Sequence, residues 1–73
     1  MSKAEFQITE CIGTLSGGKV TTELNLVEWG HMKPMYDLRR WKFDEGEKMP
    51  CKGLTLSANE LQTLRDVLNG MEI

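Results

Sequence analysis

Period-two alternation of apolar and polar residues constrains this chain most. Residues 20–29 ("VTTELNLVEW") and 35–42 alternate in this way and are rich in β-branched and aromatic side chains, which is typical of half-buried β-strands. Residues 6–15 repeat the pattern, and 52–56 ("KGLTL") form a shorter stretch of the same kind. The sequence therefore predicts four strands.

Turn signals separate these stretches. "SGGK" at 16–19 predicts a hairpin turn, because glycine adopts positive φ without steric cost. "GHMKP" ends the second strand, since proline cannot donate to a sheet ladder. Residues 44–51, "DEGEKMPC", are predicted to form a polar loop.

The last segment carries a helix start signal. Ser57 precedes Glu60 by three residues, the spacing of a capping box, and leucines follow at three- and four-residue steps. Gly70 is expected to end the helix. A β-β-β-β-α order without βαβ units predicts an α+β domain over 1–73, an antiparallel meander with one C-terminal helix.

Chain length and cysteine content narrow the class of protein. A domain of 73 residues has a small core, so dimerisation is expected. Cys11 and Cys51 lie forty residues apart, and His31 is the one histidine in the sequence. This content favours two free thiols over a disulfide framework or a zinc site. With neither a signal-peptide pattern nor an apolar span, we expect an intracellular, cytoplasmic protein without a cofactor.

The alternation also predicts which side chains share a face of the sheet. If Leu24, Leu26 and Leu38 face the helix, then Trp29, Arg39 and Trp41 point away from it. One helix cannot cover both faces, so the second face should meet another subunit or a ligand. For each tryptophan, pattern alone favours packing over a binding role.

Positive charge is concentrated near these residues. The net charge is -2 and the pI about 5.3, yet six of the nine basic residues lie within 33–52: Lys33, Arg39, Arg40, Lys42, Lys48 and Lys52. Cations that neutralise phosphates, next to aromatic faces that stack on unpaired bases, are what single-stranded nucleic acid requires.

The runs "ELNLVEW", "YDLRRW" and "EKMPCKGLTLSANEL" resemble the single-stranded-DNA-binding domain of the transcriptional coactivator positive cofactor four, most closely its bacterial YdbC-like branch. The resemblance covers the chain from Phe6 to the helix. It implies a homodimer in which curved four-stranded sheets form a channel for single-stranded DNA and the helices help to build the interface. It also implies a role in transcription or in DNA replication and repair, and a nucleoid-associated location.

The resemblance assigns site residues by position. The binding arginine falls on Arg39, the stacking tryptophan on Trp41 and the lysine before the glycine on Lys52, while Trp29 matches a tryptophan of the bacterial pattern. The eukaryotic pattern has one more residue between the arginine and the tryptophan. The remaining cations expected to contact nucleic acid are Arg40, Lys42, Lys19 and Lys33.

Three other functions compete with single-stranded DNA binding. An enzyme is disfavoured, because neither cysteine nor His31 has the context of a catalytic residue and Ser57 is explained as a helix cap. A dimeric protein-interaction module could use the same aromatic face. Single-stranded RNA is the closest alternative, since stacking platforms accept any base.

Overall fold

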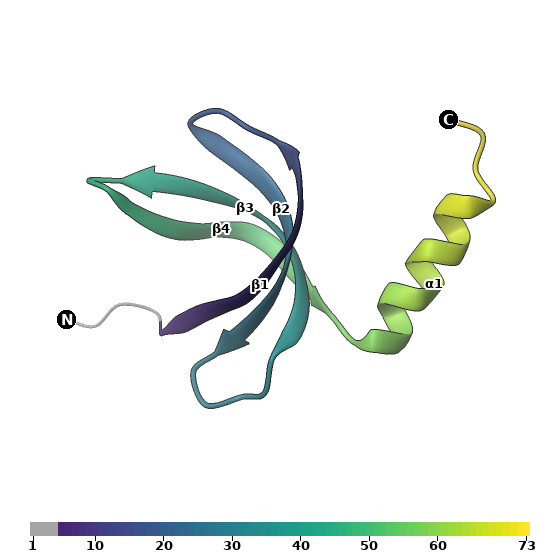
Figure 1. Ribbon diagram of the computed structural model, residues 1–73, viewed down its shortest axis with the longest axis horizontal. Coiled ribbons are helices and arrows are strands. Elements are labelled where there is room, and N and C mark those ends of the chain that lie inside the picture. The colour runs from purple at the N-terminus through teal and green to yellow at the C-terminus, as the bar shows by residue number, and fades with distance from the viewer. Residues whose placement is uncertain (1–4) are drawn as a thin grey trace.

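The computed structural model describes residues 5–73 and contains one antiparallel sheet followed by one helix (Figure 1). Residues 1–4 of the predicted domain lie outside the described residues. The elements are β1 (Phe6–Ser16), β2 (Val20–Trp29), β3 (Met35–Asp44), β4 (Glu47–Leu56) and α1 (Ala58–Asn69). The four strands lie in sequence order, so the predicted α+β meander with a C-terminal helix is confirmed.

The turns set the lengths of the strands. The predicted hairpin turn between β1 and β2 is confirmed, with Gly18 at φ 112°. The loop predicted over 44–51 is wrong, because β3 runs to Asp44 and β4 already begins at Glu47. Glu45 and Gly46, at φ 53° and 82°, reverse the chain in two residues. Pro50 fits because β4 is an edge strand, where a missing N–H costs no ladder bond.

The sheet is strongly curved (Figure 1). The pairing of β1 with β2 shifts register at three places, and β3 with β4 at one, between Arg39 and Trp41. Such bulges bend a strand and increase its twist. The curvature brings side chains from distant ends of the strands together on the concave face.

The buried residues lie on the face that points away from the helix. Val27 and Trp41 are fully buried there, with the polar side chains of Glu23, Asn25 and Asp37. Leu24, Leu26 and Leu38, expected on the helix side, are only half-buried. The predicted division of side chains between the two faces is confirmed, and within the single chain the buried core lies on the face away from the helix.

The helix explains this difference. The capping box is confirmed: the backbone N–H of Glu60 donates to Ser57 Oγ at 3.1 Å, and that of Ser57 donates to Glu60 Oε1 at 2.9 Å. Gly70 caps the end, as predicted. Yet α1 stands apart from the strands, joined through the end of β4 (Figure 1). In α1, all of which the structure describes, no side chain is buried.

Candidate nucleic-acid interface

An aromatic cluster, made of Phe6, Trp29 and Trp41, fills the concave face. The Phe6 ring centroid lies 5.7 Å from that of Trp29 and 5.2 Å from that of Trp41, and the two indoles are parallel within 3° at 6.4 Å. The rings come from β1, β2 and β3, so the sheet's curvature creates the cluster. Because Trp41 is 0% exposed, no base can stack on it while the cluster is closed.

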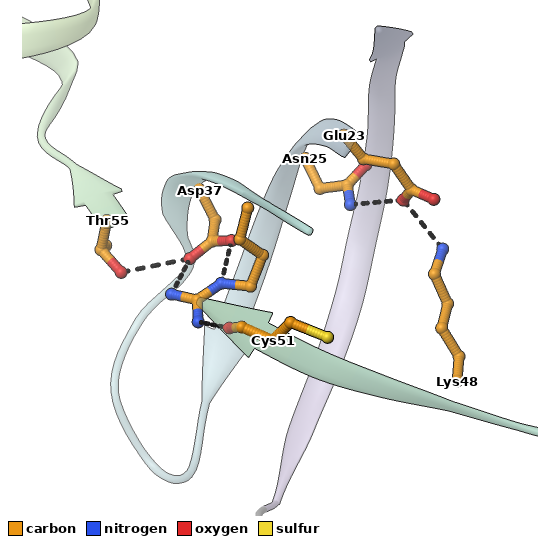
Figure 2. A network of polar contacts seen from close by, with 7 residues as sticks. Glu23, Asn25, Asp37, Lys48, Cys51 and Thr55 are labelled. Atoms are coloured by element: carbon orange, nitrogen blue, oxygen red, sulfur yellow. Dashed lines mark hydrogen bonds and ion pairs between the residues drawn. The ribbon is translucent and has the colours of Figure 1, made fainter. Parts of the chain in front are cut away.

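Arg39 is held in place beside this cluster. Its Nε and Nη2 donate to the two carboxylate oxygens of Asp37 at 2.6 and 2.8 Å, and its Nη1 donates to the Cys51 carbonyl at 3.0 Å (Figure 2). Thr55 Oγ1 also donates to Asp37, at 3.2 Å. The guanidinium carbon lies 4.7 Å from the centre of the Trp29 ring. Arg39 thus forms a fixed cation–π pair with Trp29.

Gly53 makes room for this arrangement. It pairs with Arg39 across β3 and β4, and a Cβ at Gly53 would lie 1.9 Å from Arg39 Cβ and 2.7 Å from the Leu38 carbonyl oxygen. Any other residue would collide with the backbone and stem of its partner. The sequence motif of a lysine followed by glycine therefore has a structural basis in the close approach of two strands.

A second polar cluster surrounds Glu23 on β2. Its carboxylate accepts hydrogen bonds from Asn25 Nδ2 at 2.9 Å and Lys48 Nζ at 2.8 Å (Figure 2). It accepts a third from Thr21 Oγ1 at 2.7 Å. Burial opposes ionisation of Glu23, but these hydrogen bonds and the charge of Lys48 outweigh it and lower its pKa. Lys48 Nζ also lies 5.3 Å from the centre of the Trp41 ring.

Three buried polar atoms of the concave face have no hydrogen-bond partner within the described chain. They are the indole nitrogens Nε1 of Trp29 and Trp41 and the amide oxygen Oδ1 of Asn25. A buried donor or acceptor that is left unpaired is costly. The closed cluster therefore retains unused hydrogen-bonding capacity.

A hollow of about 390 Å³ lies next to the Arg39–Trp29 pair. Its lining consists of Trp29, Met32, Met35, Arg39 and Thr55. The side chain of Arg39 retains 15% of its exposure. This hollow offers an aromatic surface, a guanidinium and adaptable methionines within one concave site.

Comparison with known proteins identifies a relative of this chain. No family model matches the sequence. An uncharacterized protein from Treponema pallidum (strain Nichols) is 39% identical over 70 residues, an alignment that spans 93% of this chain and 80% of the treponemal protein. The chain belongs to the family of that treponemal protein.

In this member of the treponemal family, the structure brings three of the predicted site residues together. Trp29, Arg39 and Trp41 share the concave face, and Lys52 is exposed in the bulge beside Gly53. The other predicted cations are dispersed: Arg40 and Lys42 are exposed on the helix-side face of β3, while Lys19 and Lys33 flank opposite ends of β2. These four do not form one patch with Arg39.

Sequence reasoning missed three residues of the site. Glu23 and Asn25 share strand parity with Val27 and Trp29, so the alternation would have placed them on the same face. Lys48 was counted among the basic residues but placed in a loop, and its contact with Glu23, 25 residues away, follows from the curvature of the sheet. No sequence pattern signals that contact.

Metal-holding groups, cysteines and membrane-spanning helices can each be assessed within residues 5–73. Within that range no group of three or more histidine, cysteine or acidic side chains could hold a metal ion. Cys11 is a free, exposed thiol and Cys51 a free, half-buried one, as predicted. Over the same residues, no helix has the length and apolar character needed to cross a membrane.

Proposed function

We propose that the protein binds single-stranded DNA as a homodimer, without strong sequence selection, in transcription or in DNA replication and repair. The observation that carries this proposal is the Arg39–Trp29 pair at the hollow. Single-strand binding needs a cation for phosphate and an aromatic face for bases, and both are present there in fixed geometry.

Arg39 can hold a phosphate without leaving Asp37. A guanidinium has five N–H groups, and three of them are used by Asp37 and the Cys51 carbonyl. The remaining two can donate to a phosphate oxygen at the hollow. Asp37 acts here as a positioning residue that fixes the plane of the guanidinium over Trp29. The exposed cations Lys52, Arg40, Lys42, Lys19 and Lys33 would add long-range attraction for the backbone.

The uncovered helix-side face supports the homodimer. An apolar groove between sheet and helix is lined by Leu24 and Tyr36 on the strands and by Leu61, Leu64 and Leu68 on α1. Leu54 and Val67 are 51% and 55% exposed. A chain of this length buries too little apolar surface to leave such a face in water, and a second copy offers the matching surface.

The test is binding of a fluorescent oligo-dT at two salt concentrations, with a duplex and an oligo-U of equal length alongside. We expect affinity for the single strand to fall steeply with added salt, and to exceed affinity for the duplex. Arg39→Ala should weaken binding and flatten the salt slope by about 0.7, the value for one lost phosphate contact on a single strand.

Equal affinity for duplex and single strand would contradict the proposal. Tighter binding of oligo-U than of oligo-dT would instead identify the ligand as RNA. Absence of any salt-dependent binding would favour the interaction-module alternative, whose apolar contacts are nearly indifferent to salt.

A further inference from the structure

We infer that Glu23 competes with phosphate for Lys48. In the free protein, the Lys48–Glu23 ion pair closes the β3–β4 hairpin over Trp41. In the complex, a phosphate of the bound single strand replaces the Glu23 carboxylate at Lys48, and the Trp41 ring is uncovered. This inference rests on the proposed function and deepens it. It assigns Lys48 as a phosphate-binding residue, and it makes the stacking role that the resemblance gives to Trp41 available only when the strand is bound.

The first support is the position of Lys48. It lies near the start of β4, beside the hairpin turn, and reaches back across the concave face to Glu23 on β2. On the way its ammonium passes over the face of the Trp41 ring, at 5.3 Å from the centre. Lys48 is therefore both a cover for Trp41 and the link between the hairpin and β2.

The second support is the difference in exposure between the two partners. The Lys48 side chain is 27% exposed, whereas that of Glu23 is 7% exposed. A phosphate can reach the ammonium from solvent without entering the site of the carboxylate. Glu23 would keep its hydrogen bonds from Thr21 and Asn25 after Lys48 leaves, and these two donors continue to stabilise the ionised carboxylate.

The third support is the contrast with Arg39 and Asp37. That pair is bidentate, Asp37 is 0% exposed, and Thr55 adds a further bond to the carboxylate. Lys48 makes one point contact from a flexible stem. Compared with the Arg39–Asp37 pair, the Lys48–Glu23 pair is the one suited to exchange.

The fourth support is the pair of unpaired indole donors in the aromatic cluster. The indole N–H groups of Trp29 and Trp41 are buried without a partner within the described chain. Opening of the cluster lets these N–H groups donate to oxygens of the bound strand or of solvent. The closed state therefore lacks hydrogen bonds that the open state gains.

The experiment combines a double-mutant cycle with a measurement on the free protein. Glu23→Gln should bind oligo-dT at least about fivefold more tightly than the parent, the low end of typical coupling between sites. In a Lys48→Met background the same change should have no effect, because the competition it removes no longer exists. Glu45→Gln, an exposed acid in the same hairpin, is the matched control for loss of one negative charge.

Acrylamide quenching of Trp41 fluorescence reports the opening without nucleic acid. In a Trp29→Phe background, both Glu23→Gln and Lys48→Met should raise the quenching constant of the folded protein. Circular dichroism and thermal unfolding, measured on every variant, restrict the comparison to folded protein. Two independent variants keep the test decisive if one of them fails to fold.

Three outcomes would overturn the inference. In the first, Glu23→Gln raises oligo-dT affinity equally in the parent and in the Lys48→Met background, or Glu45→Gln raises it as much. Either result would mean that only the overall charge matters. In the second, quenching is unchanged in both variants. In the third, the parent protein binds no single strand at any salt concentration; the proposed function then fails and the inference falls with it. Binding by the parent with no gain in Glu23→Gln rejects the inference alone.

Discussion

At the scale of single residues, the two tryptophans have different environments although both lie on the concave face. Trp41 is completely enclosed, whereas Trp29 borders the hollow and is partly exposed. The pattern alone could place both rings on one face, because strand parity is visible in the sequence. It could not rank their exposure, because that depends on how far the sheet curves.

This difference predicts that truncation of Trp41 shows first as lost stability and truncation of Trp29 first as lost binding. Trp41→Ala should lower the free energy of unfolding by about 3–5 kcal/mol, as expected for a buried aromatic. Trp29→Ala should cost roughly 1–3 kcal/mol of oligo-dT binding through lost stacking, with the salt slope retained. Urea unfolding and titration of the same two variants check both statements. A Trp29→Ala protein that binds as the parent does would remove Trp29 from the site.

Glu23 predicts a specific dependence of stability on pH. Its pKa is lowered in the folded protein, so the unfolded chain binds the proton more readily and the stabilisation is lost as the pH falls below the ordinary value of 4.5. It is fully present above that value. Glu23→Gln should be less stable than the parent at pH 7, and the gap should close in acid. Urea unfolding at pH 7, 5, 4 and 3 measures this; a gap that is constant with pH would refute the assignment.

At the scale of elements, the alternation and the capping box identified all four strands and the helix. The prediction of a loop over 44–51 was wrong. It relied on acidic residues, Gly46 and Pro50, which are common in turns. In the structure two residues suffice for the turn, and the edge strand β4 tolerates the proline. Local sequence patterns determine whether a segment is a strand or a helix. The register that pairs Arg39 with Gly53 depends instead on how the two strands pack, so it cannot be predicted from either strand alone.

The contact between β3 and β4 leads to a prediction on Gly53. Gly53→Ala should destabilise the protein by roughly 1–3 kcal/mol, because the added methyl group overlaps the stem of Arg39. Arg39 should also shift from Trp29, so oligo-dT binding weakens in the protein that remains folded. Gly13→Ala, which meets nothing within 4 Å, is the control and should change the melting temperature little. Equal melting temperatures for the two variants would contradict the prediction.

At the scale of the whole molecule, the buried core and the helix lie on opposite sides of the sheet. Leu24, Leu26 and Leu38 lie on the helix side, but the helix stands off and leaves them half-buried. The sequence could not reveal this, because the same apolar pattern serves a core within one chain and an interface between two. The proposed homodimer would cover these leucines.

The prediction at this scale is a mass of twice the 8.3 kDa chain in sedimentation or multi-angle scattering at micromolar protein. Leu64→Asp, in the lining of the groove, should shift the population to monomer, because it buries a charge in an apolar contact. Thr63→Asp on the same helix, exposed and outside the groove lining, is the control for an added acidic residue on α1. A parent chain that stays monomeric and folded on dilution would exclude the homodimer.

The two outer strands of the sheet also limit how copies of this chain can add to one another. An open edge with regular pairing is a template for strands of other molecules. Here β1 is interrupted at three places, and β4 carries Pro50, which offers no N–H. Neither border suits continued strand addition, so both edges disfavour growth of the sheet from one molecule to the next. In the proposed homodimer, association through the helix-side groove would close after one partner and would not continue into fibres.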